Sequence, residues 1–131
     1  MALLTRRSLL AVAAASLLPL PAFADMMTSA YEPAAFAAAQ ASGKPVLIHI
    51  HASWCPTCKA QNAVLKDLMT DAAYKDVVIV KVDFDAQKDV VAAMGANSQS
   101  TLIMFKGKTE VGRSVGATNK DVISAMMKLA V

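Results

Sequence analysis

Residues 46–59 read VLIHIHASWCPTCK and contain both cysteines of the chain, Cys55 and Cys58. The run over residues 46–51 predicts a buried strand, and Pro56 favours the first turn of a helix directly after it. Cys55 would then lie at the N-terminus of this helix, with Cys58 one turn later on the same face. Two sulfurs at that spacing can form a disulfide without movement of the backbone. The stretch therefore predicts a strand and a helix that meet at a reversible dithiol.

The two thiols are expected to have different roles. Unpaired N–H groups and the positive end of the helix dipole favour an anion at a helix N-terminus. Such a position lowers the pKa of a thiol from its usual value of about 8.5. We therefore expect Cys55 to attack a partner disulfide as the nucleophile, and Cys58 to resolve the mixed disulfide and release the product.

Two inert uses of the cysteines are the alternatives. A structural bridge over so short a loop would constrain the unfolded chain little. The second alternative is that the two cysteines form half of a structural zinc site, but such a site needs four ligands and the chain has no second CxxC.

Residues 1–24 have the pattern of a cleavable signal peptide. Arg6 and Arg7 precede an apolar stretch over residues 9–20, and Ala22-Phe23-Ala24 is typical of a cleavage site. The apolar stretch is shorter than the roughly 20 residues that a spanning helix needs. The start of the chain resembles a twin-arginine export signal and also suits the general secretory route. We expect a periplasmic or secreted bacterial protein, cleaved after Ala24.

Residues 25–131 are expected to form one domain that is not membrane-embedded. Without residues 1–24 the chain loses two of its 13 basic residues and keeps all ten acidic ones, so its net charge is close to zero. A balance of this kind does not indicate a nucleic acid or an anionic membrane surface as a partner.

The rest of the sequence predicts alternating strands and helices. The predicted helices cover residues 33–40, the stretch after Pro56 to Met69, residues 89–94, and a final helix with Thr118 as its N-cap and Val122, Ile123, Met126 and Leu129 on one face. The predicted strands cover residues 46–51 and 77–84 and a hairpin of residues 101–105 and 110–115 around the turn 106–108.

This order, with the dithiol at the first strand–helix junction, resembles the thioredoxin fold over about residues 30–131. The stretches that carry the resemblance are Trp54-Cys55-Pro56-Thr57-Cys58-Lys59, Lys81-Val82-Asp83, residues 101–107 and Val115-Gly116-Ala117. The resemblance implies an α/β domain with a mixed central sheet flanked by helices. It also implies a thiol-disulfide oxidoreductase without a cofactor, with the roles of Cys55 and Cys58 given above.

The family resemblance extends to direction, partners and substrate contacts. Strong oxidants of the family have a histidine at the position of Thr57, so threonine favours a reductase. The motif is similar to that of periplasmic reductases that serve cytochrome c maturation, and residues 43–46 are similar to modules of membrane thiol transporters. The expected partners are client proteins with disulfides or thiols and such a transporter as electron donor, and a monomer is expected. The expected substrate-binding residues are Trp54, Pro56, Thr57, Ser100 and Thr101.

The chain departs from the family pattern at two positions. Ser100 replaces the cis-proline that precedes Thr101 in thioredoxins, and a non-proline cis bond costs about 3 kcal/mol. His49 replaces a buried aspartate, so it would act on Cys58 as a general base or be a neutral core histidine. His51 is interpreted as structural.

Two further hypotheses follow from these departures. His49, His51, Cys55 and Cys58 would suit zinc or copper if the strand turned both imidazoles toward the thiols. The other hypothesis is a redox-sensing adaptor without catalysis, in which the disulfide only switches a surface.

Overall fold

The computed structural model describes residues 28–131, and the predicted signal peptide lies outside them. The sheet has five strands in the order β1-β3-β2-β4-β5. β1, β2 and β3 run parallel to one another, while β4 runs antiparallel to both β2 and β5. The bounds of the strands are Thr28–Ala30 for β1, Pro45–His51 for β2, Val78–Asp83 for β3, Thr101–Lys106 for β4 and Thr109–Val115 for β5.

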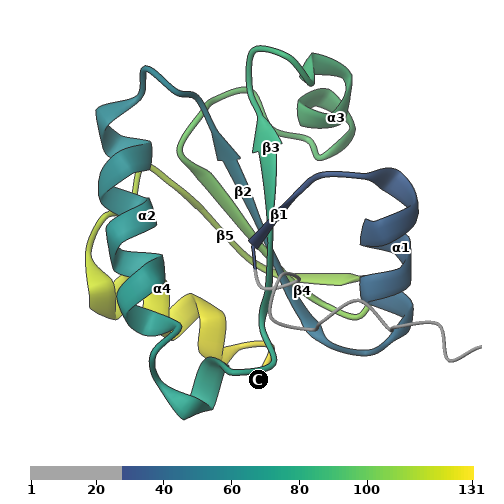
Figure 1. The fold of residues 1–131 in the computed structure, drawn as a ribbon, viewed down its shortest axis with the longest axis vertical. Coiled ribbons are helices and arrows are strands. Elements are labelled where there is room, and N and C mark those ends of the chain that lie inside the picture. Colours follow the sequence, from purple (N-terminus) through teal and green to yellow (C-terminus); the bar gives the residue numbers. More distant parts are fainter. Residues whose placement is uncertain (1–27) are drawn as a thin grey trace, which may run out of the picture.

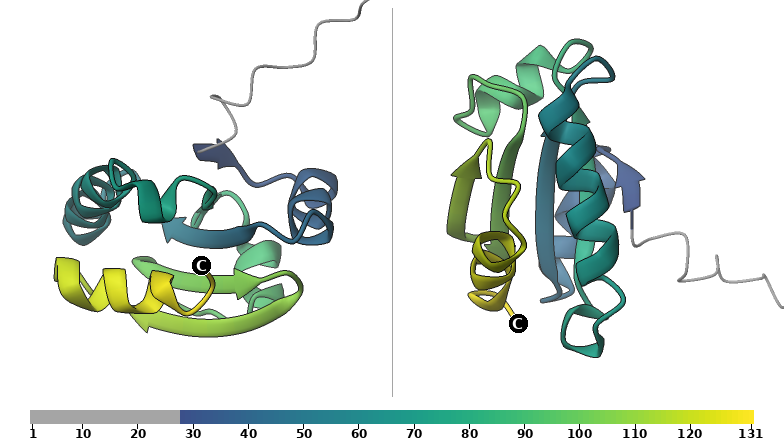
Figure 2. Two further views of the ribbon diagram at one scale, coloured as in Figure 1. Left: turned by 90° about the horizontal axis from the view of Figure 1, so that it is seen from below. Right: turned by 90° about the vertical axis from the view of Figure 1, so that its left-hand side faces the viewer.

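Helices cover both faces of this sheet, which is seen edge-on in Figure 1 with α2 and α4 on the left and α1 and α3 on the right. Their bounds are Pro33–Ala41 for α1, Pro56–Leu68 for α2, Lys88–Ala93 for α3 and Lys120–Lys128 for α4, and a short 3-10 turn spans Ala72–Tyr74. The two further views in Figure 2 show the same three layers. The predicted fold class, a single α/β domain with a mixed sheet, is confirmed.

The core consists of two clusters, one on each face of the sheet. Leu47 faces α2 and α4, while its neighbours Val46 and Ile48 face α1 and α3. This alternation is the two-residue period of a strand buried on both sides. His49 continues the period on the α2 side and is fully buried. β2 therefore carries His49 into the layer that lies under the dithiol.

The sequence did not reveal β1. It is three residues long and pairs with β3 from Thr28↔Ile79 to Ala30↔Lys81. A strand this short shows no alternation of apolar and polar residues, so only its pairing with β3 identifies it.

The predicted N-cap of the last helix is wrong by one residue. Asn119, not Thr118, caps α4, because its Oδ1 accepts hydrogen bonds from the N–H groups of Asp121 at 2.8 Å and Val122 at 3.2 Å. Both residue types are good caps. The pair Thr118 and Asp121 has the spacing of a capping box, but the helix begins at Lys120.

Among residues 28–131, no helix has both the length and the apolar character that crossing a membrane requires.

Candidate active site

The dithiol lies where β2 gives way to α2. Cys55 is the N-cap of α2, and its Sγ accepts a hydrogen bond from the Cys58 N–H at 3.1 Å. The two cysteines are joined by a disulfide, with their Cα atoms 5.3 Å apart. The predicted geometry is thus confirmed. A thiolate on Cys55 would keep this backbone donor at the positive end of the helix.

The surface beside Cys55 presents Trp54, Pro56 and Thr57. Trp54 is 58% exposed, and its indole Nε1–H donates to Asp85 Oδ2 at 2.7 Å. Pro56 is exposed and Thr57 is half-buried. These three side chains are therefore accessible to a client, as predicted for substrate-binding residues. Their role in binding a client stays a prediction.

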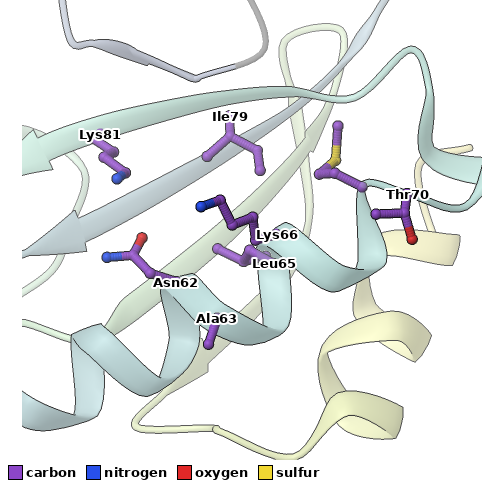
Figure 3. A pocket seen from close by; sticks show the side chains of 8 residues that line it. Asn62, Ala63, Leu65, Lys66, Thr70, Ile79 and Lys81 are labelled. Carbon is purple, nitrogen blue, oxygen red and sulfur yellow. The ribbon is translucent and has the colours of Figure 1, made fainter.

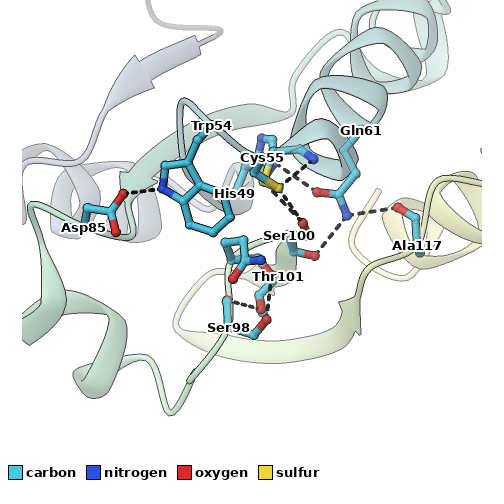
Figure 4. The surroundings of a disulfide bond; sticks show 11 residues. His49, Trp54, Cys55, Gln61, Asp85, Ser98, Ser100, Thr101 and Ala117 are labelled. Carbon is cyan, nitrogen blue, oxygen red and sulfur yellow. Dashed lines mark hydrogen bonds between the residues drawn. A yellow bond between two sulfur atoms is a disulfide. The ribbon is translucent and has the colours of Figure 1, made fainter.

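The loop before β4 faces the sulfurs from the opposite side (Figure 4). Ser100 Oγ lies 3.1 Å from Cys55 Sγ and 3.2 Å from Cys58 Sγ. All peptide bonds of residues 28–131 are trans, so the Gln99-Ser100 bond is trans as well. Thr101 is buried, and its hydroxyl donates to Ser98 O at 2.7 Å. The Thr101 side chain therefore shapes the loop, and its predicted contact with a substrate stays a prediction.

Ser100 has an uncommon backbone conformation, with φ at +61°. Among residues 28–131 it is the one non-glycine residue with positive φ, and such a conformation costs on the order of 1 kcal/mol or more. Its carbonyl oxygen accepts hydrogen bonds from Gly116 N–H at 2.9 Å and Gln61 Nε2 at 3.0 Å. These two donors hold the strained residue against the disulfide.

Gln61 is a buried residue of the site that sequence reasoning missed. Its Nε2 donates to Ser100 O and to Ala117 O at 2.9 Å, and its Oε1 lies 3.1 Å from His49 Nε2. Since both amide hydrogens are used, Oε1 is an acceptor and His49 Nε2 must carry the hydrogen. One signal was present in the sequence: Gln61 follows Cys58 at a spacing of three, on the stripe that continues at Leu65 and Leu68. A polar residue on a buried stripe indicates a specific partner.

His49 is a neutral base inside the fold. Burial above all, then the charges of His51 and Lys81, lower the pKa of His49 to about 4, although the Gln61 hydrogen bond acts in the opposite direction. With its hydrogen on Nε2, the imidazole has a free lone pair on Nδ1, and this buried atom has no hydrogen-bond partner within residues 28–131. His49 is thus a neutral core histidine with an unused proton acceptor, and its predicted role as a general base for Cys58 stays a prediction.

His51 lies on the same face of β2, half-buried, opposite Asp83 of β3. Burial and the Lys81 charge lower the pKa of His51, and the Asp83 carboxylate acts against them. The rings of His49 and His51 are 5.8 Å apart.

The proposed ligand set of His49, His51, Cys55 and Cys58 is not formed. In the described part of the chain, no group of three or more His, Cys, Asp or Glu side chains is placed to hold a metal ion. His49 Nε2 is paired with Gln61, and the sulfurs are bonded to each other and face Ser100. β2 places both imidazoles on one face of the sheet, but the two imidazoles and the two sulfurs do not converge on a common point as four metal ligands would.

A cavity of about 680 Å³ lies along α2 where the helix passes over β3 (Figure 3). Its lining is Asn62, Ala63, Leu65, Lys66, Met69, Thr70, Ile79 and Lys81. Neither cysteine is part of this lining. This cavity is therefore separate from the disulfide.

The low pKa of His49 predicts that stability falls in mild acid. In the unfolded chain this histidine titrates near about 6.5. Between that pH and about 4 the unfolded chain holds a proton that the folded chain lacks, so the free energy of unfolding should fall as the pH drops through this window. The expected loss is about 3 kcal/mol, measured by urea unfolding of the oxidised protein at several pH values.

A His49→Leu variant serves as the comparison, because it removes the titrating group. It should be less stable near neutrality, since Gln61 Oε1 loses its donor, but its stability should depend much less on pH. The lowered pKa of His51 also makes the free energy of unfolding fall as the pH drops. The lowered pKa values of Asp83 and Glu110 have the same effect, but in stronger acid. An equal slope in both proteins would contradict the neutral, buried state of His49.

Similarity to known proteins identifies the family. The thioredoxin family model matches residues 27–129. A thioredoxin of Chlamydia muridarum is 43% identical over 86 residues, which are 66% of this chain and 81% of that protein. A thioredoxin of Mycobacterium tuberculosis is 38% identical over 79 residues, covering 60% of this chain and 67% of that protein. The crystal structure of Trxlp from Edwardsiella tarda matches with a TM-score of 0.74 and 41% identity, covering 76% of this chain and 97% of that one. With its CxxC disulfide at the start of α2, the chain belongs to the thioredoxin family and is a thiol-disulfide oxidoreductase.

Proposed function

We propose that this protein reduces disulfides of client proteins in a bacterial periplasm or outside the cell. The observation that carries the proposal is the Cys55–Cys58 disulfide at the N-terminus of α2, with the uncharged Thr57 between the two sulfurs. A protein that stabilises its thiolate form strongly is a weak reductant, and one that stabilises it little is a strong reductant. Thr57 offers no positive charge to the Cys55 thiolate, which favours reduction of clients over their oxidation.

The reaction has two exchange steps. The Cys55 thiolate attacks one sulfur of the client disulfide, forms a Cys55–client bond and expels the other client sulfur as a thiolate. The Cys58 thiolate then attacks Cys55 Sγ, forms the Cys55–Cys58 disulfide and expels the second client thiolate. Two electrons pass from the protein to the client, and a dithiol donor returns them in the reverse sequence. A membrane thiol transporter or a similar dithiol protein is the donor we propose, acting on a monomer.

His49 is the proton acceptor that we assign to Cys58. Its Nδ1 is buried and has no hydrogen-bond partner within residues 28–131, and its Nε2 is paired with Gln61 of α2, the helix that Cys55 caps. A negative charge that develops on a nearby sulfur raises the pKa of an imidazole, so proton uptake by His49 is favoured as the thiolate forms.

The location rests on the first 24 residues. Their pattern of two arginines, an apolar stretch and Ala22-Phe23-Ala24 is typical of an export signal, and disulfide chemistry is common outside the cytoplasm. Fractionation of cells that express the full chain tests it: processed protein is expected in the periplasm or the medium.

The reduction potential of the Cys55/Cys58 pair tests the direction. Equilibration with glutathione is expected to give a value nearer to the about −270 mV of thioredoxin than to the about −120 mV of strong bacterial oxidants. Thr57→His should raise it by roughly 30 mV for each 1.4 kcal/mol that the new charge adds to the thiolate. Thr57→Val, which adds no charge, is the matched control.

Two results would count against the proposal. A wild-type potential close to that of the strong oxidants would reverse the direction. Failure to reduce insulin with a dithiol as electron source would favour the adaptor without catalysis.

A further inference from the structure

The hydroxyl of Ser100 touches both sulfurs of the disulfide. Its Oγ is 3.1 Å from Cys55 Sγ and 3.2 Å from Cys58 Sγ, and the residue is 4% exposed. The loop that carries it precedes β4 and faces the start of α2 across the two sulfurs (Figure 4). The hydroxyl oxygen is thus nearly equidistant from the two sulfurs that exchange electrons.

The direction of these hydrogen bonds follows from the chemistry of the disulfide. Neither sulfur of a disulfide carries a hydrogen, so the Ser100 hydroxyl must be the donor. Within residues 28–131, Ser100 Oγ has no hydrogen-bond partner besides the two sulfurs. Its hydrogen is therefore available to whichever sulfur becomes negative.

The surrounding structure fixes the hydroxyl in this place. Ser100 is held at φ +61° while its carbonyl accepts from Gly116 N–H and from Gln61 Nε2. Gln61 is anchored in turn by Ala117 O and His49. A donor held in advance needs no rearrangement when the charge appears, which is the condition for effective stabilisation of a developing anion.

We propose that Ser100 is a catalytic residue whose hydroxyl donates a hydrogen bond to the thiolates of the dithiol. This inference rests on the proposed function, since it assigns a group to the two exchange steps described there. When a donor thiolate attacks Cys55 Sγ, the Cys55–Cys58 bond breaks, its electron pair goes to Cys58 Sγ, and Ser100 donates to that sulfur. The donor's second thiolate then attacks the donor sulfur of the mixed disulfide, forms the donor's own disulfide and expels Cys55 Sγ as a thiolate, to which Ser100 donates a hydrogen bond.

The same hydroxyl stabilises the reduced form of the protein. A hydrogen bond to a charged sulfur is stronger than one to a neutral disulfide sulfur. Ser100 therefore makes the pair easier to reduce than it would be without the hydroxyl. This effect partly offsets the missing charge at Thr57 and sets how strong a reductant the protein is.

The test compares Ser100→Ala and Ser100→Gly with the wild-type protein. The pKa of Cys55, followed by the ultraviolet absorbance of its thiolate in the reduced protein, is expected to rise by about one unit in both variants. The equilibrium with a dithiol buffer should shift toward the disulfide by about tenfold, or about 30 mV, at a pH above both pKa values. The shift should shrink toward zero in acid, where both sulfurs are protonated. Glycine accepts positive φ without strain, so Ser100→Gly keeps the test valid if the alanine variant does not fold.

Ser98→Ala is the matched control. It removes a hydroxyl of the same loop that donates to Gln99 O and does not touch the sulfurs. This variant should leave both the pKa of Cys55 and the equilibrium unchanged. An unchanged pKa in Ser100→Gly, an equal shift in Ser98→Ala, or a shift of the equilibrium that does not depend on pH would overturn the proposal. None of these results bears on whether the wild-type protein reduces clients, which the insulin assay decides separately.

Discussion

A Cys58→Ser variant is expected to accumulate client proteins bound covalently to Cys55. The first exchange step needs only the Cys55 thiolate, which keeps its place at the N-terminus of α2. The second step needs a thiolate at position 58, and a serine hydroxyl does not replace it at neutral pH. The mixed disulfide should therefore persist until an external thiol attacks it. Non-reducing gels of the tagged variant, followed by mass spectrometry of the adducts, measure the effect.

The controls for this experiment come from the same pair. Cys55→Ser and the double variant should give no adducts, and turnover of insulin should drop to the uncatalysed rate in all three variants. Treatment with dithiothreitol should release the clients. The structure assigns the nucleophile to Cys55, whose Sγ accepts the N–H at the helix N-terminus. Adducts through Cys58 in the Cys55→Ser variant would contradict this assignment.

Ile123→Ala is expected to cause a large loss of stability. Ile123 is fully buried in the cluster between α4 and the sheet, so truncation removes apolar contacts and leaves a cavity. A loss of about 2 to 5 kcal/mol in the free energy of unfolding is expected. Urea unfolding of the oxidised protein measures it.

Val122 provides the matched control, since it precedes Ile123 on α4 and is 51% exposed. Val122→Ala should change the free energy of unfolding by no more than about 0.5 kcal/mol. Similar losses in the two variants would mean that α4 does not pack through the face that carries Ile123.

The sequence predicted the elements whose signals are local. β2 is a long apolar run, α2 follows it through a proline, and the paired cysteines mark the junction. The hairpin of β4 and β5 was predicted as residues 101–105 and 110–115, because a glycine turn joins two strand-like stretches, and each strand is one residue longer at the turn than predicted. In each case the deciding information lies within a few consecutive residues.

Features that depend on contacts between residues far apart in the sequence could not be predicted from the sequence. β1 exists through its pairing with β3, and the choice of Asn119 over Thr118 depends on where the chain enters α4. The network of Gln61 joins α2 to β2 and to two loops that lie 39 and 56 residues further along the chain. Ser100 was recognised as a departure from the family, but its contact with both sulfurs depends on a backbone conformation that the sequence does not specify.

The Gln61 side chain has a consequence for how clients are chosen. It ties the loops that contain Ser100 and Ala117 to the interior, so these two loops cannot shift separately without leaving buried polar groups unpaired. A rigid surface loses little conformational entropy when a complex forms. Any change of conformation that binding requires must then take place in the client. We therefore expect clients whose disulfides lie in mobile or unfolded segments to be reduced faster than clients whose disulfides lie inside a folded domain. Selection by the flexibility of the client would let one fixed surface act on many different sequences.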